Sequence, residues 1–184
     1  MKKDILILNF SPRSNGNCGH IGDMIQTFYG YPSIRSYLIA DMFTPCGTCD
    51  YECLKPNVRC PSLSQEQAEV YEAIGNADLV YFIIPNFCGM PNSLYYAFNE
   101  RSVGYFNIDR AVMAKYMAVR KRFIIVSNTE GNAFKDAMLQ QSNEAPEYLY
   151  MKTSKYGKQS IAGDLMDSEQ AKADLIGFLA GDVD

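Results

Sequence analysis

Residues 11–17 (SPRSNGN) carry hydroxyl, amide and guanidinium groups in one short run. Hydroxyls and amides donate hydrogen bonds to phosphate oxygens, and the guanidinium group of Arg13 adds a fork of donors that matches them. The run follows an apolar stretch at residues 4–10 and precedes a segment in which Ile21, Met24, Ile25 and Phe28 recur at helical spacing. Because the first N–H groups of a helix lack partners and the helix dipole favours negative charge, the run predicts an anion site.

The glycine patterns of two common phosphate loops are missing from this run. Neither G-x-G-x-x-G nor G-x-x-x-x-G-K-[ST] follows the apolar stretch, so neither a dinucleotide fingerprint nor a P-loop is predicted. Side-chain hydroxyls and amides in place of glycines suit one terminal phosphate better than a pyrophosphate or a triphosphate. The alternative is a plain turn that caps a helix and holds no ligand.

Two further loops, each after an apolar stretch, carry groups that suit a flat ring. Residues 85–91 (PNFCGMP) place Phe87, which can stack on a ring, beside Asn86, which can bond its edge. Taken alone, they also fit a capped loop with Phe87 in the core. Residues 127–132 (SNTEGN) add small polar groups. Because the carboxyl ends of parallel strands meet at one edge of a sheet, the loops together outline a site for flavin mononucleotide (FMN).

Most cysteines gather in residues 44–61, which we call the cysteine loop. Of the six in the chain, Cys46, Cys49, Cys53 and Cys60 lie there. Four thiolates this close in sequence can hold a [4Fe–4S] cluster or a Zn²⁺ ion, and a cluster beside a flavin gives electrons a destination. The alternative is a metal-free loop, reduced or prone to disulfides, that folds over the flavin.

The same loop contains a C-x5-R pattern, formed by Cys53 and Arg59, which is the spacing with which cysteine phosphatases cradle a phosphate. That motif requires a strand before it and a helix after it, whereas a cysteine-rich loop surrounds it here. His20 is the one histidine and begins a predicted helix, so no Ser-His-Asp set is available. We therefore expect chemistry that a cofactor carries.

Apolar stretches alternate with amphipathic helices along the chain. Strands are predicted at residues 4–10, 34–39, 79–84, 123–127 and 148–152, and helices at 20–29, 65–74, 93–101, 133–141 and 168–179. The strands are apolar on both faces, as in a parallel sheet that is covered on two sides. The alternation predicts a doubly wound α/β fold with ligands at the carboxyl ends of its strands. Ser64 with Gln67 and Asp167 with Gln170 are predicted to cap two helices.

Length and charge limit the function classes. A chain of 184 residues indicates one domain, residues 1–184, and a net charge of −4 argues against a nucleic-acid surface. We interpret the basic residues 120–122 as a solvated strand entrance. No apolar run reaches the length of a membrane span and no signal peptide follows the N-terminus, so we expect a cytoplasmic protein. The apolar residues within 105–117 lie outside any predicted strand and indicate either a homo-oligomer interface or ordinary core packing.

Residues 8–17 (LNFSPRSNGN) are similar to the phosphate loop of the flavodoxin-like NAD(P)H-dependent FMN reductases, a family with the iron–sulfur flavoproteins as a branch. Residues 85–91 resemble the second flavin loop of that family, and residues 99–101 resemble the motif that ends its following helix. The resemblance runs from residue 4 to roughly residue 140. It implies a flavodoxin-like, doubly wound parallel sheet of five strands with helices on both faces, in a homo-oligomer with the flavin near the interface.

The resemblance also implies three groups of flavin contacts. The phosphate contacts are Ser11, Arg13, Ser14, Asn15, Asn17 and Cys18; the ring contacts are Pro85, Asn86, Phe87, Cys88, Gly89 and Met90; further contacts are Ser127, Asn128 and Gly131. Cys18 departs from the threonine or serine usual in the family, so a poor thiol donor replaces a hydroxyl. Phe87 departs from a frequent tyrosine and keeps only the stacking face. The cysteine loop has three residues between its second and third cysteines, where iron–sulfur flavoproteins have two.

The expected function is that of an FMN-dependent oxidoreductase. It passes reducing equivalents from NAD(P)H through bound FMN to a small acceptor such as a quinone or free flavin. The cofactor carries the chemistry, and the protein supplies binding and orientation. The alternatives are a flavin/iron–sulfur electron-transfer protein that serves a protein partner, and a phosphatase that uses Cys53 and Arg59.

Overall fold

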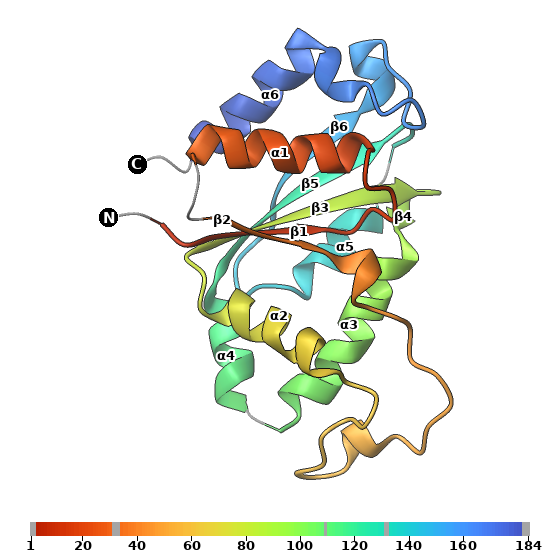
Figure 1. Cartoon of the computed structure of the whole chain (residues 1–184), viewed down its shortest axis with the longest axis vertical. Helices are drawn as coiled ribbons and strands as arrows, with labels where there is room; N and C mark the ends of the chain where they lie inside the picture. The colour runs from red at the N-terminus through yellow and green to blue at the C-terminus, as the bar shows by residue number, and fades with distance from the viewer. Residues whose placement is uncertain (1–2, 31–33, 109, 131–132, 182–184) are drawn as a thin grey trace.

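Five parallel strands form the central sheet of the computed structural model, which describes residues 3–30, 34–108, 110–130 and 133–181 (Figure 1). The strands are β1 (Ile5–Asn9), β2 (Ile34–Leu38), β3 (Leu79–Phe87), β5 (Arg120–Ser127) and β6 (Glu147–Lys152), in the spatial order β2-β1-β3-β5-β6. A short sixth strand, β4 (Met90–Pro91), pairs antiparallel with the end of β3. With β4 set aside, the order is that of flavodoxin-like folds, which confirms the predicted fold class.

Helices cover both faces of the sheet (Figure 1). One face carries α1 (Asn17–Tyr29) and α6 (Glu169–Ala180), and the other carries α2 (Gln65–Gly75), α3 (Ser93–Phe106), α4 (Arg110–Ala118) and α5 (Ala133–Leu139). The 3-10 turns η1 (Ile39–Asp41), η2 (Glu52–Leu54), η3 (Thr153–Tyr156) and η4 (Leu165–Asp167) shape the connections. None of the described helices is long and apolar enough to cross a membrane.

Each strand sends alternate side chains to opposite faces, so one strand contributes to two cores. In β1, Leu6 and Leu8 belong to the core beneath α2 to α5, while Ile5 and Ile7 belong to the core beneath α1 and α6. Every residue of β1 is buried. This two-sided burial explains why the strands read as continuous apolar runs in the sequence.

The direction of winding reverses between β1 and β3. The chain passes from β1 outward to β2, then returns to β3 on the other side of β1 and continues to β5 and β6. In open α/β sheets such a reversal leaves a crevice at the carboxyl ends of the two strands. The loops after β1 and β3 therefore lie beside each other, as the sequence predicted.

Helix α4 lies in the apolar segment for which the sequence predicted no element. Tyr116 is buried there, and Tyr105, Phe106 and Met117 pack against the same core. Met113 stays 45% exposed. Much of the apolar character of this segment therefore serves core packing, and the homo-oligomer stays a prediction.

One of the two predicted helix caps is confirmed. Ser64 and Gln67 form a reciprocal capping box at the start of α2. The other prediction is wrong by one residue, because Asp167 closes the turn η4 and Ser168 caps α6, accepting from the Ala171 backbone N–H at 3.4 Å.

The interpretation of residues 120–122 as a solvated strand entrance is also wrong. They belong to β5, and Lys121 and Arg122 are only 4% and 5% exposed. Lys121 Nζ donates to the Tyr116 backbone oxygen, and the Arg122 guanidinium lies 3.6 Å from the ring centre of Phe178. Long side chains can bury their stems in this way while their charged ends find carbonyls or an aromatic face.

Candidate functional site

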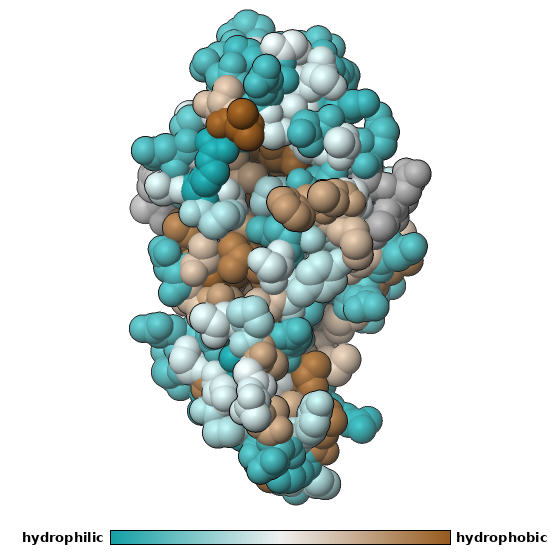
Figure 2. Space-filling model, turned by 90° about the vertical axis from the view of Figure 1, so that its right-hand side faces the viewer, coloured by the Kyte–Doolittle hydropathy of each residue, from teal (hydrophilic) through white to brown (hydrophobic). Residues whose placement is uncertain are grey.

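A cavity of about 700 Å³ opens at the carboxyl ends of the strands. Its lining comes mainly from the loop after β1, the end of β3, the start of α3 and the loop after η3. Figure 2 looks onto this edge and shows a hollow toward the top of the molecule, with hydrophobic residues in and around it. The cavity occupies the predicted crevice, and its volume suits a small-molecule ligand.

The N-terminal end of α1 forms one wall of this cavity. Gly16 is the N-cap residue and offers no side chain, so the first N–H groups of the helix have no side-chain cap. Gly16, Asn17 and Cys18 all line the cavity. Arg13 is the one charged side chain among the described lining residues. An uncapped helix N-terminus beside a guanidinium group attracts anions.

Residues 157–165, which we call the strap, dock on this wall. Arg13 Nη2 donates to the Ile161 backbone oxygen at 2.9 Å, and Arg13 Nη1 lies 3.5 Å from the Ser160 backbone oxygen. A guanidinium group has five N–H donors, so Arg13 retains donors for another acceptor. The side chain can therefore bind an anion and the strap together.

Two more side chains of the α1 end are tied to the strap. Asn17 Nδ2 donates to the Ser160 backbone oxygen at 3.2 Å, and its Oδ1 accepts from the Leu165 backbone N–H at 2.9 Å. His20 Nδ1 lies 2.9 Å from the Gly163 backbone oxygen. Both ends of the Asn17 amide are engaged, and its NH₂ group keeps a second N–H, so the predicted phosphate contact can come from that N–H or from the backbone N–H.

The other predicted phosphate residues divide between the cavity and the surface. Ser11 lines the cavity, and its Oγ accepts from the Arg13 backbone N–H at 3.1 Å, which shapes the turn. Ser14 and Asn15 are exposed and are not among the described lining residues. The structure therefore brings Ser11, Arg13 and Asn17 together and leaves the other two side chains outside.

Cys18 lies in the first turn of α1, and its side chain points into the core that this helix covers, with 3% of the residue exposed. Burial raises the pKa of Cys18 from 9.0 to about 12, so the thiol stays protonated at neutral pH. A buried neutral thiol is a weak donor, and the backbone N–H of this first-turn residue is the group that suits an anion.

The second predicted loop is the tip of a β-hairpin. Strand β3 continues through Pro85, Asn86 and Phe87, and the chain turns at Cys88 and Gly89, whose φ angles are 52° and 85°. Positive φ is what such a tight turn requires, and glycine adopts it without strain. The three β3 residues line the cavity, whereas Cys88, Gly89 and Met90 are not among its described lining residues.

Phe87 is 72% exposed, so the alternative that places it in the core is wrong. Its ring lines the cavity and has a face free to stack on a flat ligand. Nearby, Asn92 Oδ1 caps α3 through the Tyr95 backbone N–H at 3.4 Å, and Asn92 Nδ2 donates to the Phe10 backbone oxygen at 2.6 Å. The start of α3 is thereby tied to the end of β1 beside the cavity.

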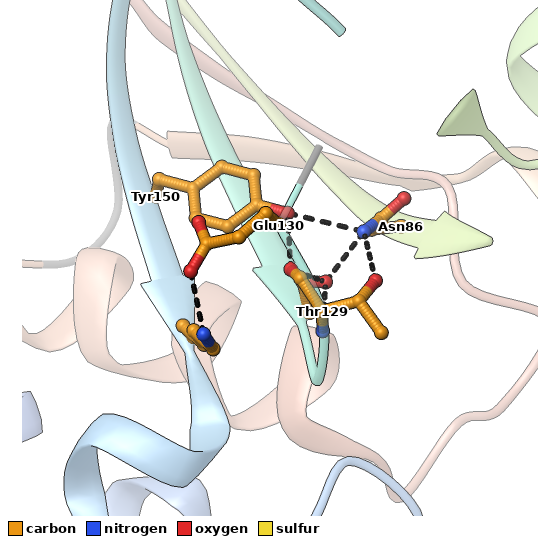
Figure 3. Close-up of polar contacts among 6 residues, drawn as sticks. Asn86, Thr129, Glu130 and Tyr150 are labelled. Carbon is orange, nitrogen blue, oxygen red and sulfur yellow. Dashed lines mark hydrogen bonds and ion pairs between the residues drawn. The ribbon is translucent and has the colours of Figure 1, made fainter. Parts of the chain in front are cut away.

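A hydrogen-bond network joins the ends of β3, β5 and β6 (Figure 3). Asn86 Nδ2 lies 2.5 Å from Ser127 Oγ, 3.2 Å from Thr129 Oγ1 and 3.1 Å from Tyr150 Oη. The hydroxyls of Ser127 and Tyr150 each donate to the Thr129 backbone oxygen at 2.6 Å. The network fixes the position of Asn86, at the end of β3, relative to Ser127 and Thr129, at the end of β5.

The proton count of this network sets the orientation of the Asn86 amide. A hydroxyl has one proton, and the protons of Ser127 and Tyr150 are given to the Thr129 backbone oxygen. Both hydroxyls can therefore only accept from Asn86, so its NH₂ group faces them. Asn86 Oδ1 is buried and has no hydrogen-bond partner. An unsatisfied buried acceptor of this kind costs about 1–3 kcal/mol.

The third predicted loop contributes less than expected. Ser127 acts through the network, while Asn128 is exposed and is not among the described lining residues. Gly131 lies outside the described residues. Glu130, which follows β5, and Lys152, which ends β6, form an ion pair at 2.5 Å (Figure 3).

The cysteine loop is held against α3 by polar side chains of that helix. Glu100 Oε2 accepts from the Cys46 backbone N–H at 2.8 Å. The buried Arg101 donates to the backbone oxygens of Thr44 and Pro45 at 3.1 and 2.9 Å. Residues 99–101 were singled out by the family resemblance alone, and two of them anchor this loop.

Farther along α3, Gly104 gives the cysteine loop room. A Cβ atom at this position would collide with Cys60 Cβ and would lie 3.6 Å from Cys53 Cβ. Asn107 Nδ2 donates to the Cys53 backbone oxygen at 2.5 Å. The loop thus approaches the helix too closely for any side chain at position 104.

These contacts do not assemble a metal centre. Cys46 and Cys49 are exposed, Cys53 and Cys60 are half-buried, and all are free thiols. Among the described residues, no group of three or more His, Cys, Asp or Glu could hold a metal ion. Partial burial raises the pKa of Cys46, with the Arg101 guanidinium opposing the shift. The predicted cluster or Zn²⁺ ion gains no support.

The C-x5-R pattern lacks the framework that a phosphatase requires. Cys53 lies within the 3-10 turn η2, and the next helix of the chain is α2, which begins at Gln65. No strand leads into Cys53 in this part of the described chain. The hydrolytic alternative is not supported.

The sequence did not reveal the strap or Tyr150 as parts of the site. Tyr150 reaches the network because β6 pairs with β5 in the register that sets Ile125 opposite Tyr150. The strap carried one usable signal, since its residues follow the last strand and therefore leave the sheet at its carboxyl edge.

Comparisons with known proteins agree with the observed architecture. No family model matches the sequence, and no curated protein does. The Trp repressor binding protein from Bacillus subtilis has a similar structure, with a TM-score of 0.63 and 15% identity over 95% of this chain and 97% of that chain. RosB, solved with bound 8-demethyl-8-formylriboflavin-5'-phosphate, has a TM-score of 0.64 and 16% identity over 96% and 75% of the two chains.

A third similar structure is an FMN-dependent NADH-azoreductase from Bacillus anthracis in complex with FMN. Its TM-score is 0.59, with 12% identity over 98% of this chain and 99% of that chain. At identities this low the likeness establishes the shared fold alone, because one fold hosts many functions.

Proposed function

We propose that the protein is an FMN-dependent oxidoreductase that passes reducing equivalents from NAD(P)H to a small acceptor. One observation carries the proposal: a single cavity joins an anion end to a ring end. The uncapped α1 terminus and Arg13 lie at the anion end, and Phe87 and Asn86 lie at the ring end. FMN has the matching parts, a terminal phosphate and a flat ring whose edge carries an N–H donor.

Two of the similar structures support the assignment of the ligand. RosB was solved with a riboflavin-5'-phosphate derivative bound, and the azoreductase was solved with FMN. Both share the fold in which the crevice between β1 and β3 is the expected ligand position.

Each end of the cavity has a defined task in this proposal. Arg13 and the backbone N–H groups of Asn17 and Cys18 bind the phosphate. Phe87 stacks on the ring, and Asn86 Oδ1 accepts from its N–H edge. Bound FMN supplies hydride and electron transfer, so the protein needs no acid–base pair of its own. The remaining ring and phosphate contacts named from the family resemblance stay predictions.

Titration with FMN and with riboflavin, followed by flavin fluorescence, tests the proposal. The two ligands differ only in the phosphate, so FMN is expected to bind more tightly. Arg13→Ala should weaken FMN binding by about 10- to 100-fold, the value of a charge-assisted hydrogen bond, and leave riboflavin binding nearly unchanged. Absence of FMN binding to the wild-type chain would overturn the proposal.

The electron-transfer alternative is separated from the enzyme by turnover. An enzyme oxidises NAD(P)H with a quinone and no partner protein, whereas a carrier needs its partner.

A further inference from the structure

Cys53 and Cys60 meet at one point on α3, beside Gly104. The three atoms of other segments that lie nearest to a Cβ atom at position 104 are Cβ and Sγ of Cys60 and Cβ of Cys53. Because that position collides with Cys60 Cβ and lies 3.6 Å from Cys53 Cβ, the two cysteine Cβ atoms are at most about 6 Å apart. A disulfide places these atoms about 3.5–4.5 Å apart, so a loop movement of about 2 Å suffices to reach that spacing.

A tight turn between the two cysteines explains why they meet. Its central residues are Pro56 and Asn57, and Asn57 has a φ of 59°. The Val58 backbone N–H closes the turn by donating to the Lys55 backbone oxygen at 3.3 Å. Proline followed by a residue with positive φ is typical of a type II turn, which reverses the direction of the backbone. The chain therefore returns after the first cysteine and places the second beside it.

The fold holds both cysteines in place and leaves their thiols accessible. Asn107 Nδ2 donates to the Cys53 backbone oxygen at 2.5 Å and to the Lys55 backbone oxygen at 3.2 Å. The Cys60 backbone oxygen accepts from the Leu63 backbone N–H at 3.1 Å, and Cys60 packs against the core beneath α2 to α5. Both thiols are free and half-buried, so a small molecule can reach them.

We propose that Cys53 and Cys60 are a dithiol that reduces small disulfides and becomes an intramolecular disulfide. The thiolate of one cysteine attacks a sulfur atom of the substrate, which forms a mixed disulfide and releases one thiol. The thiolate of the other cysteine attacks the protein sulfur of that bond, which closes the disulfide and releases the second thiol. Two protein thiols are oxidised, one substrate disulfide is reduced, and two protons pass to the released thiols. The inference does not depend on bound FMN.

The same loop offers a competing pair, Cys46 and Cys49. Their C-x2-C spacing is that of common redox motifs, but both are exposed, and neither supplies any of the three atoms nearest to position 104. A pair that is held by short spacing alone forms its bond in the unfolded chain as well. A pair that the fold holds together forms its bond more readily in the folded chain, because one thiol is more concentrated at the other.

Equilibration of the full chain with reduced and oxidised glutathione tests the proposal. Alkylation after an acid quench, followed by mass spectrometry, counts the free thiols, and the equilibrium constant is measured in native buffer and in concentrated urea. In the folded wild type, we expect two of the six thiols to be lost as a pair. The native constant should be at least about tenfold larger than the constant in urea.

Substitutions identify the pair and the contact that holds it. Cys53→Ser and Cys60→Ser should each abolish the native disulfide, whereas Cys49→Ser should keep it with an unchanged constant. These side chains are exposed or half-buried, so each variant should fold, which circular dichroism checks. Gly104→Ala should lower the native constant toward the value in urea, because its Cβ displaces Cys60. Gly177→Ala, with nothing within 4 Å of its Cβ, should not.

Equal constants in the folded and the unfolded chain would overturn the proposal. A native disulfide that persists in Cys53→Ser or in Cys60→Ser would overturn it too, because another pair would then carry the bond. So would a folded wild type that keeps all six thiols at a glutathione ratio that oxidises the chain in urea. FMN binding is measured separately, so none of these outcomes bears on the proposed function.

Discussion

At the scale of single residues, the ring end of the site depends on which way one amide points. The Asn86 amide has one orientation because the hydroxyls of Ser127 and Tyr150 donate to the Thr129 backbone oxygen and can only accept from its NH₂ group. The amide is thus oriented by side chains from two other strands. Tyr150 is not among the described lining residues of the cavity, so it acts on the site as a positioning residue, through Asn86.

Tyr150→Phe removes one hydroxyl of this network and keeps the ring. We expect FMN binding to weaken about 2- to 10-fold, the value of one neutral hydrogen bond, because the Asn86 amide loses one of the two hydroxyls that hold its orientation. Fluorescence titration measures the affinity, and Tyr37→Phe on β2 is the control. Unchanged FMN affinity in Tyr150→Phe would show that the ligand does not use the orientation of Asn86.

At the scale of elements, α1 and α3 position two segments that lack regular structure, the strap and the cysteine loop. The strap is bound to the α1 end, and the cysteine loop is bound to α3 through Glu100, Arg101 and Asn107. Neither segment builds a core of its own, so each depends on side chains from a helix end or a helix face.

Gly104→Ala tests how closely the cysteine loop docks on α3. Alanine favours helix by about 1 kcal/mol over glycine, but a Cβ here collides with Cys60, so we expect the loop to detach and its thiols to react faster with a thiol reagent. Gly177→Ala on α6 is the matched control, since nothing lies within 4 Å of its Cβ, and it should stabilise the fold. Equal thiol reactivity in wild type and Gly104→Ala would contradict the close docking.

At the scale of the whole molecule, two basic side chains, Lys121 and Arg122, are buried in a sheet that is otherwise apolar on both faces. Lys121 lies in β5 beneath α4, and its Nζ lies 4.4 Å from the ring centre of Tyr116. Burial lowers the pKa of Lys121 from 10.5 to about 7. In the unfolded chain the same amine stays protonated to much higher pH.

The free energy of unfolding should therefore depend on pH. Above about pH 7 the folded state binds fewer protons at Lys121 than the unfolded state does, so stability rises with pH. The rise ends near pH 9, where the Cys18 thiol ionises in the unfolded chain while burial raises its folded pKa to about 12, and near pH 10 ionisation of the unfolded tyrosines turns the slope negative, because burial also raises the pKa of Tyr95 to about 12. Urea unfolding across this range measures the slope, and Lys121→Met should flatten it. A wild-type slope that is flat or negative between about pH 7 and 8 would refute the lowered pKa of Lys121.

The sequence by itself determined the parts of this protein that depend on local pattern. The apolar runs of β1 and β3 predicted a sheet covered on both faces, and polar residues directly after them predicted a ligand edge. Helix spacing and the Ser64 cap were readable for the same reason, since each involves residues that are near neighbours in the chain.

Only the tertiary structure decided which distant residues meet. Arg13 bonds to Ser160, which lies 147 positions away, and Asn86 meets Tyr150 across 64 positions. The sequence predicted a solvated Lys121 because a charged side chain usually lies on the surface. In the structure its Nζ donates instead to the backbone oxygens of Tyr116 and Val119, at the end of a helix that packs against the strand. Periodicity reports how much of a residue is buried, but the partner of a buried polar group follows from strand order and register, which no local pattern encodes.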